Sequence, residues 1–467
     1  MGEVRKLQKK LRQIENLELK LSLTPEEAVK VSKKEELRSR LAELLLHLSG
    51  LQQTHGIVGE EEDKMKRQVE TGTEHHTDHT PAVKLAREDH REKQDKAKSG
   101  AEEEIKERED TEFSSLKALW EKAKFRLRIL KGHSDIITCV AAVDNLVISG
   151  SRDTTVKVWH VPTATEQRNL GGHSGGVTCV NTPPSEYCRK LASALHLSET
   201  ERFILSGSTD CCVRIWTLSS GQCVKSIYTF NAVTSLCFIA EWEEYLCRVF
   251  DCVTDAGKLQ VWDWLSQENC QSVNAHLDAV TTLQSHGPLV FSGSTDGSVC
   301  VWEVCDGAVE PLNQLHRVDE VNGRLRLSAR GDHIFLANGR SSIRVLNWRT
   351  GTMRRLTNHS STAGVTDCVN QIPGVLVGSC FDLTSGESTL NLFSLPQCRY
   401  LVSISSSDLP RLLCFAAWVT PSGGHRWVTG GRELTVWEQL PGNVKKRCGV
   451  QLLNLTHDPL RISLLCV

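Results

Sequence analysis

The sequence predicts a mostly β protein that is built from repeats and preceded by an α-helical arm. Three observations carry this prediction. Three stretches share one residue pattern at fixed spacings, several further stretches alternate apolar and polar residues, and residues 1–50 carry leucines at helical spacing. The first feature predicts repeated hairpins, the second predicts strands between them, and the third predicts amphipathic helices.

The three full repeats occupy residues 132–159, 172–216 and 275–302, and the first reads GHSDIITCVAAVDNLVISGSRDTTVKVW. In each copy a serine precedes an aspartate by four residues, and the aspartate precedes a tryptophan by six. In the first and third copies a histidine lies sixteen residues before that serine. A polar Ser-Gly-Ser-x-Asp turn between two alternating apolar runs predicts a tight hairpin.

On these motifs the chain resembles the WD40 repeat family, whose fold is a β-propeller of four-stranded blades. The resemblance implies that the histidine, serine, aspartate and tryptophan of each repeat form a hydrogen-bonded chain inside a blade. These four side chains can satisfy one another's donors and acceptors, as buried polar groups require. The expected structural tetrads are His133, Ser149, Asp153, Trp159; His173, Ser206, Asp210, Trp216; and His276, Ser292, Asp296, Trp302.

Four weaker repeats fill the remaining length, at residues 228–273, 313–356, 358–404 and 405–440. Their tryptophan place holds, in order, Trp262, Leu346, Phe393 and Trp437. Counting all copies, we expect an all-β, seven-bladed WD40 propeller preceded by an N-terminal α-helical, coiled-coil arm. The resemblance also implies that Phe125–Leu130 is the outer strand of the last blade, which closes the ring and leaves no open strand edge.

The predicted domains are a helical hairpin or coiled coil at 1–50, a charged, partly disordered linker at 51–124, the propeller at 125–440 and a tail at 441–467. Within the linker we expect a charged helix from Pro81 to about Lys98, ended by Ser99-Gly100, and an amphipathic helix from Phe113 that docks on the propeller edge. The tail echoes the start of a repeat, and we expect extra strands that form a half-blade, a strand that competes with residues 125–130, or a chain cut short.

The arm carries two apolar stripes, one at Leu7, Leu11, Ile14, Leu17 and Leu21, and one at Ala28, Val31, Leu37, Leu41, Leu44, Leu45 and Leu48. Thr24-Pro25-Glu26-Glu27 between them predicts a helix start with a capping box. An antiparallel hairpin, a coiled-coil dimer and a partner's groove are all able to bury these stripes. The arm is also similar to helical tails of some translation and exon-junction factors.

The second full repeat carries an insertion, since His173 and Ser206 are 33 residues apart. We expect the extra segment PPSEYCRKLASALHLSET to project as a loop, and long loops are frequent sites of function.

Composition excludes several classes of function. A net charge of -2 gives no electrostatic case for nucleic acid or a membrane surface, so we expect no direct DNA binding and no membrane association. Without an apolar signal segment we expect a reducing compartment, cytoplasmic or nuclear, in which the 18 cysteines pack as small apolar side chains. In such a compartment we expect no glycosylation at the sequons of Asn358 and Asn454.

Motifs for catalysis or cofactors are also missing, so we expect no enzyme, no cofactor and no metal. A hydrolase triad of Ser, His and Asp would not recur in every repeat, so the tetrads favour a structural role. The cluster His75, His76, Asp78 and His79 has ligand chemistry, but a solvated linker is the more common setting for such a run.

The preferred hypothesis is a non-catalytic scaffold or adaptor that binds other proteins on the propeller face and through its helices, with self-association through residues 1–50. An RNA-linked assembly factor on a ribonucleoprotein or ribosome is the alternative. In the family, partners contact the turns before each Asp and the loops that lead into each blade. The resemblance thus implies contacts at Arg152, Thr209 and Thr295 in the turns, and at Asp135, Gly175 and Asp278 in the loops.

Overall fold

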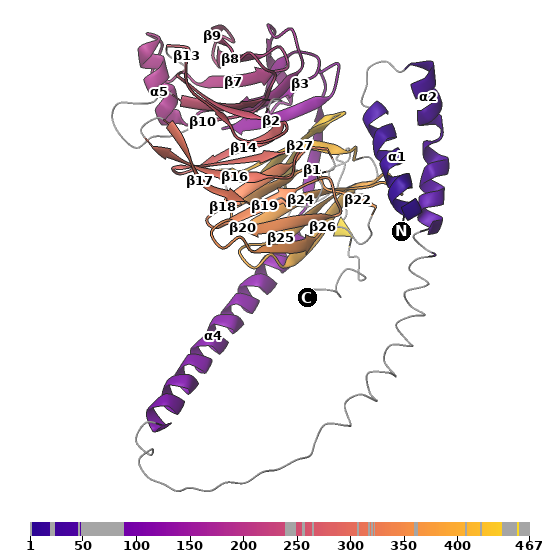
Figure 1. Ribbon diagram of the computed structural model, residues 1–467, viewed down its shortest axis with the longest axis vertical. Coiled ribbons are helices and arrows are strands. Elements are labelled where there is room, and N and C mark those ends of the chain that lie inside the picture. The colour runs from indigo at the N-terminus through magenta and orange to yellow at the C-terminus, as the bar shows by residue number, and fades with distance from the viewer. Residues whose placement is uncertain are drawn as a thin grey trace. The chain divides into compact units, whose positions relative to one another are not determined.

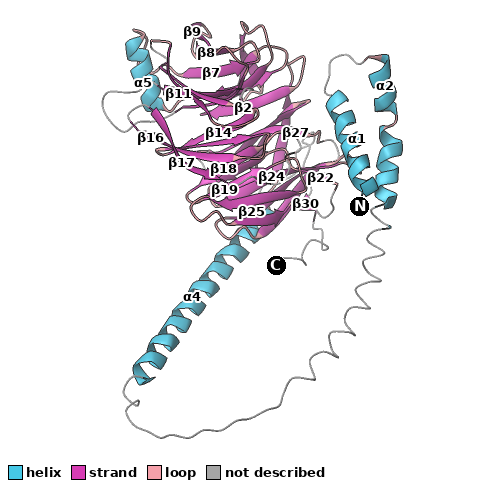
Figure 2. Ribbon diagram, viewed as in Figure 1, coloured by secondary structure: helices cyan, strands magenta, loops and turns pink. Residues whose placement is uncertain are grey.

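The chain forms two units, Met1–Glu18 with Ser22–Trp120 and Leu19–Leu21 with Glu121–Val467. In the first unit the described elements are helices, and strands make up nearly all of the second (Figure 2). The structure, a computed structural model, describes residues 2–18, 24–44, 47, 88–238, 249–254, 257–263, 266–305, 308–315, 318, 321, 323–358, 363–406, 409–420, 423–440 and 455–456.

The first unit begins with α1 (Gly2–Glu18) and α2 (Pro25–Ser32), and a further helical stretch follows at residues 34–44. The predicted capping box is confirmed: Glu27 N donates to Thr24 Oγ1 over 3.3 Å, and Thr24 N donates to Glu27 Oε2 over 3.0 Å. An ion pair of 2.6 Å joins Arg40 to Glu3, so the stretch 34–44 lies alongside α1.

The two predicted apolar stripes differ in how well they are buried. Leu7, Leu11 and Ile14 of α1 are buried, and so is Leu41. Ala28 of the second stripe is exposed in the single chain, in which α2 buries none of its residues. The helix is interrupted at Lys33, so the residues before and after this point do not present one continuous face.

Helix α4 (Glu88–Glu121) is longer than the sequence suggested. The expected break at Ser99-Gly100 does not occur. One glycine costs a helix only about 1 kcal/mol, and the surrounding Glu, Lys and Arg residues favour the helical state. An ion pair of 3.1 Å between Arg108 and Glu112, one turn apart, adds local support. Residues 51–87, with the histidine cluster, lie outside the described residues.

The second unit contains six four-stranded antiparallel blades, each named here after its innermost strand. From the inside outward, the strands of the β2, β6 and β10 blades are β2 (Ile137–Val143), β3 (Leu146–Ser151), β4 (Val156–His160), β5 (Thr165–Leu170); β6 (Val177–Asn181), β7 (Phe203–Ser208), β8 (Cys212–Thr217), β9 (Cys223–Tyr228); and β10 (Val233–Phe238), β11 (Val249–Thr254), β12 (Lys258–Asp263), β13 (Glu268–Asn274). Those of the β14, β18 and β27 blades are β14 (Val280–His286), β15 (Leu289–Ser294), β16 (Val299–Cys305), β17 (Ala308–Leu315); β18 (Arg326–Arg330), β19 (His333–Ala337), β20 (Ser342–Asn347), β21 (Met353–Thr357); and β27 (Leu412–Val419), β28 (His425–Gly431), β29 (Leu434–Gln439), β1 (Phe125–Leu130).

A further sheet stands between the β18 and β27 blades and departs from this pattern. It consists of β22 (Gly364–Val365), β23 (Val369–Ile372), β24 (Val375–Asp382), β25 (Ser388–Ser394), β26 (Tyr400–Ser406) and β30 (Leu455–Thr456). Its inner strand is split, since β22 and β23 both pair with β24, and β30 from the tail pairs with its outer strand β26. The expectation of seven regular blades therefore corresponds to six four-stranded blades and this irregular β22 sheet.

The sheets form a closed ring. Their inner strands contact one another in chain order, β2 with β6, β6 with β10, and so on to β23 with β27 and β27 with β2. As the sequence predicted, β1 pairs antiparallel with β29, with Leu127 opposite Trp437. Figure 1 labels β1 near β27, the inner strand of the same blade. Phe125 packs on Trp427 with ring centroids 4.5 Å apart. The first strand of this unit thus completes the last blade, and the ring does not expose an open edge.

Adjacent blades approach each other through glycines on their second strands. A Cβ built on Gly150 would lie 2.5 Å from Val177 on the next blade and 2.6 Å from Cys139. Gly207 repeats this arrangement against Val233, at 2.5 Å. Only glycine permits this distance, so the Ser-Gly-Ser motif contributes to packing between blades as well as to hydrogen bonding.

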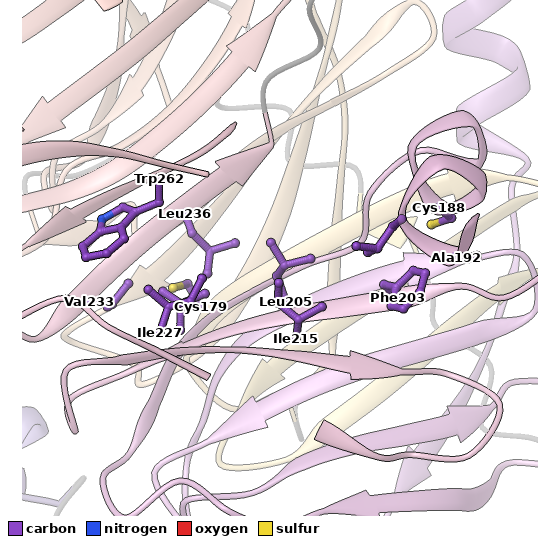
Figure 3. Close-up of a cluster of buried hydrophobic side chains, with 12 residues drawn as sticks. Cys179, Cys188, Ala192, Phe203, Leu205, Ile215, Ile227, Val233, Leu236 and Trp262 are labelled. Carbon is purple, nitrogen blue, oxygen red and sulfur yellow. The ribbon is translucent and has the colours of Figure 1, made fainter. Parts of the chain in front are cut away.

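The insertion in the β6 blade is partly a helix rather than the predicted loop. Helix α5 (Ser185–Ala194) buries Cys188, Leu191 and Ala192, which recur at helical spacing. Figure 3 shows Cys188 and Ala192 near Phe203, in the same cluster as Leu205 and Ile215. Tyr187 contacts Phe238 of the β10 blade edge-on, with ring centroids 4.6 Å apart. The insertion therefore packs against the β6 and β10 blades.

Among the described helices, none is long and apolar enough to cross a membrane.

Candidate functional site

The first tetrad forms a continuous hydrogen-bonded chain inside the β2 blade. His133 Nδ1 lies 2.7 Å from Asp153 Oδ2, and His133 Nε2 lies 2.7 Å from Ser149 Oγ. Trp159 Nε1 donates to Ser149 Oγ over 2.8 Å. A carboxylate only accepts and an indole N–H only donates. With a neutral imidazole these constraints give one direction: Trp159 donates to Ser149, Ser149 to His133, and His133 to Asp153.

The second tetrad has the same geometry despite the insertion between its histidine and serine. His173 lies 2.9 Å from Asp210 and 2.8 Å from Ser206, and Trp216 donates to Ser206 over 2.8 Å. In this blade and in the β2 blade, the residue after the histidine also donates its backbone N–H to the aspartate. The aspartate thus fixes the lead-in loop to the hairpin turn.

The third tetrad departs from the predicted pattern by one residue. His276 Nδ1 bonds Ser298 Oγ at 2.5 Å, and Ser298 Oγ in turn donates to Asp296 Oδ1 at 2.5 Å. His276 Nε2 and Trp302 Nε1 both reach Ser292 Oγ, at 2.8 Å and 2.9 Å. The expected direct bond between His276 and Asp296 is therefore replaced by a serine bridge. Ser298 lies two residues after the aspartate, where the β2 blade has Thr155.

The environment of the tetrads shifts the pKa values of their acids and bases. Burial alone would raise the pKa of Asp153, but hydrogen bonds from His133 and Thr155 and the charge of His133 hold it well below the usual range. The pKa values of Asp210 and Asp296 are lowered by the same balance. Burial lowers the pKa of His276 to about 4 and also lowers that of His173, with a partial offset from the neighbouring aspartates. The aspartates are therefore ionised at neutral pH, and His173 and His276 are neutral.

This arrangement does not supply a hydrolytic nucleophile. Ser149, Ser206 and Ser292 are each 0% exposed, and each accepts an indole N–H. A nucleophilic serine must reach its substrate, so we assign the tetrads a structural role.

Two polar clusters escaped the sequence-based prediction. In the β27 blade, Trp437 Nε1 donates to Thr429 Oγ1 over 2.9 Å, so a threonine takes the serine place. In the β22 sheet, Asn358 is 1% exposed and donates to Thr366 Oγ1 over 2.8 Å. Asn391 donates to Asn358 Oδ1 over 3.0 Å. Asn358, the asparagine of the sequon, is therefore part of a buried polar network. The sequence signal for the first cluster was the short turn that follows Thr429. The sequence contained no signal for the second cluster.

The six predicted contact residues lie on one face, which we call the loop face. It carries the loops that lead from each outer strand into the next inner strand and the turns between second and third strands. Backbone N–H groups of Arg152, Thr209 and Thr295 donate over 3.0 Å to the lead-in loops of their own blades. Arg152 Nε lies 3.8 Å from Asp135 Oδ2. The structure therefore brings each turn residue next to its lead-in partner, Asp135, Gly175 or Asp278.

Exposed apolar side chains on the loop face were not predicted. Phe230 and Leu277 are 73% and 85% exposed, and Tyr228 is 55% exposed. The rings of Tyr228 and Phe230 contact edge-on with centroids 5.2 Å apart. Phe230 and Leu277 occupy the same lead-in position, directly after the histidine place, in the adjacent β10 and β14 blades. The matching positions of the β2 and β6 blades hold Ser134 and Ser174. An alignment of the repeats therefore shows large apolar residues where the other two blades have serine.

Burial affects the thiols inside the described blades. Burial raises the pKa of Cys139 to about 11 and that of Cys179 and Cys368 to about 12, so these thiols stay protonated at neutral pH. Within the described ranges, no three His, Cys, Asp or Glu side chains gather as a metal site would require.

Comparison with known proteins gives one family. The WD40 family model, "WD domain, G-beta repeat", matches residues 124–160, 164–217 and 267–303, which contain the three tetrads. A solved structure, the computationally designed Ika8 protein, is 20% identical with a TM-score of 0.48 and covers 67% of this chain and 99% of its own.

The similar curated proteins have varied names. Kinesin-like protein KIF21A of Homo sapiens is 25% identical over 225 residues, 45% of this chain and 13% of that protein. Cell division control protein 4 of Saccharomyces cerevisiae is 27% identical over 209 residues, 40% of this chain and 25% of that protein. Small ribosomal subunit protein RACK1y of Oryza sativa subsp. japonica is 26% identical over 188 residues, 37% of this chain and 49% of that protein. The chain spans about half of these relatives or less.

Proposed function

We propose that this chain, a β-propeller with WD40 repeats, is a non-catalytic scaffold that binds other proteins on its loop face. Proteins with such propellers generally act without catalysis, and the buried tetrad serines agree with that role. The ring of blades holds the loops and turns in fixed positions, so a partner meets a surface that is already ordered.

The observation that carries this proposal is the exposed group of Phe230, Tyr228 and Leu277. Single exposed apolar residues are common, but here two large ones recur at one structural position in adjacent blades. Aromatic side chains at protein interfaces contribute much of the binding energy when a partner covers them. Phe230 also has a φ of 67°, a conformation that a bulky residue adopts at an energetic cost.

The six contact residues named from the sequence then form the polar surroundings of this group. Arg152, Thr209 and Asp278 are exposed, and Asp135, Gly175 and Thr295 are partly so. In our proposal they supply hydrogen bonds and charge complementarity around the apolar contact, as the rims of protein interfaces do.

Three further features belong to the proposal. We count the β22 sheet as the seventh blade of the ring. We assign residues 1–50 a second interaction, which is self-association or the binding of a helical partner. The buried, protonated thiols suit a reducing compartment, which is cytoplasmic or nuclear.

A second candidate function is an RNA-linked assembly factor. It is favoured by similarity to proteins named small ribosomal subunit protein RACK1y and RACK1, the latter from Drosophila melanogaster and 22% identical over 189 residues. In that case the partners of the loop face are components of a ribonucleoprotein.

One experiment tests both candidates. The full chain is tagged, its complexes are cross-linked with and without nuclease, and bound proteins are quantified by mass spectrometry. We expect Phe230→Asp with Leu277→Asp to weaken the main partners at least tenfold, on the scale of about 2 kcal/mol per interface hot spot. The matched control is Leu312→Asp, an exposed leucine on outer strand β17. Equal loss in both variants contradicts the loop-face proposal, and loss of the partners on nuclease treatment selects the ribonucleoprotein function.

A further inference from the structure

A cleft lies between the β2 and β6 blades, on the face opposite to the loop face. Its volume is about 490 Å³, within the range of ligand sites in proteins. Leu146 begins β3 and Leu218 follows β8, and the turns at the other ends of these strands belong to the loop face. The β2 blade supplies Leu146 and Arg168 to the lining, and the β6 blade supplies Thr200, Glu201, Arg202 and Leu218.

The apolar part of the lining consists of Leu146 and Leu218, one from each blade. Both are half-buried, and both pack against one cluster of buried side chains that includes Ile148 and Ile204. This packing holds the two leucines in place, while their uncovered atoms face the cleft. An apolar side chain that enters the cleft can therefore displace water from fixed apolar surface.

The wall from the β6 blade is held by hydrogen bonds. Thr200 is the last residue of the insertion in this blade, and Glu201 after it is only 9% exposed. Glu201 Oε1 accepts from Ser219 N over 3.0 Å and from Arg202 N over 3.1 Å, and Glu201 Oε2 accepts from Ser219 Oγ. Leu218 N donates to the carbonyl of Arg202 over 2.8 Å. The insertion thus ends in an ordered wall, so a ligand does not have to order the backbone there.

Two guanidinium groups, one from each blade, provide donors in the cleft. Arg168 donates to the carbonyl of Ser219 over 2.5 Å and to that of Gln167 over 3.3 Å, and among the described residues it forms no ion pair. Arg202 reaches Asp144 Oδ2 only at 3.5 Å, and the Asp144 side chain is 74% exposed, so this pair is weak. A guanidinium has five N–H donors, so both arginines keep donors available for a ligand.

We propose that this cleft binds an acidic peptide segment of a protein partner. A carboxylate of the segment pairs with Arg168 and Arg202, and a neighbouring apolar side chain packs on Leu146 and Leu218. A guanidinium matches a carboxylate through two parallel N–H donors. Arg168 and Thr200 are exposed, so the site is a surface cleft. Such a cleft suits a side chain of a longer chain better than a small molecule, which protein pockets enclose more completely.

Selection of random peptides displayed on phage against the full chain tests this site. We expect enriched peptides with Asp or Glu beside Leu, Ile or Phe. Binding of the most enriched peptide, followed by fluorescence anisotropy, should weaken as the salt concentration rises. Arg168→Gln and Arg202→Gln should each weaken it about tenfold, the scale of a lost hydrogen bond between charged groups. Replacing the acidic residues of the peptide by their amides should weaken binding to the wild-type chain at least as much.

Two further variants separate the loss of a ligand contact from damage to the fold. Thr200→Trp keeps both arginines and fills the cleft from an exposed position, so it should also prevent binding. Asp144→Asn removes the carboxylate that competes for Arg202 and should strengthen binding about two- to fivefold. Asp144 has a φ of 53°, which asparagine also tolerates. Misfolding cannot produce such a gain in affinity.

Two controls show whether the effect is specific to this cleft. Arg355→Gln removes an exposed arginine from outer strand β21 and should leave peptide binding unchanged. Phe230→Asp with Leu277→Asp should also leave it unchanged, since the cleft does not depend on the function proposed for the loop face. The proposal is overturned if no enriched peptide depends on Arg168 and Arg202, or if the amide peptides bind as tightly as the acidic ones.

Discussion

Replacing Asp153 by alanine is the sharpest test of the tetrad geometry. Asp153 Oδ2 accepts from His133 Nδ1 and from Ser134 N, and Asp153 Oδ1 accepts from Thr155 N and Thr155 Oγ1. Ser134 is exposed, so its N–H can bond to water instead. Thr155 N–H is then left without an acceptor, and His133 Nδ1–H keeps only its longer contact of 3.3 Å to Thr155 Oγ1. At about 1–3 kcal/mol for an unsatisfied buried donor and up to about 1 kcal/mol for the weakened bond, we expect a loss of about 1–4 kcal/mol in unfolding free energy.

The third tetrad provides an internal comparison. His276 donates to Ser298 rather than to Asp296, so Asp296→Ala leaves that histidine its acceptor. We therefore expect Asp296→Ala to cost about 1 kcal/mol less than Asp153→Ala. Urea denaturation followed by tryptophan fluorescence measures both variants, with Glu199→Ala, an exposed residue, as control. If Asp153→Ala stays within about 0.5 kcal/mol of the wild type, as surface changes do, the hydrogen-bond account is wrong.

Three further predictions concern acid stability, blade packing and the arm. The folded pKa of His276 is about 4, below its usual value, so the unfolded chain binds the proton first. Stability should fall by up to about 3 kcal/mol as the pH drops from about 6.5 to about 4, and denaturation of His276→Gln should show a smaller change over that window. Gly207→Ala would place a Cβ 2.5 Å from Val233 and should lower the unfolding free energy by about 1–3 kcal/mol. Adding Val233→Ala should recover part of that loss, and Gly171→Ala, with nothing within 4 Å, should be neutral. Changing Leu37, Leu41 and Leu44 together to Glu should abolish the arm's self-association or helical partner in light scattering and pull-downs and spare the partners of the loop face; loss of both contradicts two separate modules.

Sequence spacing predicted the parts of this fold that depend on short, repeated motifs. The capping box at Thr24 follows from a local pattern alone. The tetrads of the β2 and β6 blades and the closing strand β1 follow from the resemblance to WD40 repeats that the spacing of the motifs supports.

Local sequence patterns could not predict the features that depend on packing between distant segments. Helix α5 is short, and its apolar face became visible only where Phe203 and Phe238 cover it. The serine bridge at Ser298 and the network at Asn358 use residue types that are common on protein surfaces.

The central claim is that the loop face, at Phe230 and Leu277, contacts a protein partner. Its most direct test places a photo-cross-linking amino acid at position 230, 277 or 312 of the full chain in cells, followed by irradiation and nuclease treatment. We expect discrete protein adducts at positions 230 and 277 that are absent at position 312 on outer strand β17. Adducts of the same pattern at all three positions, or none at 230 and 277, contradict the claim.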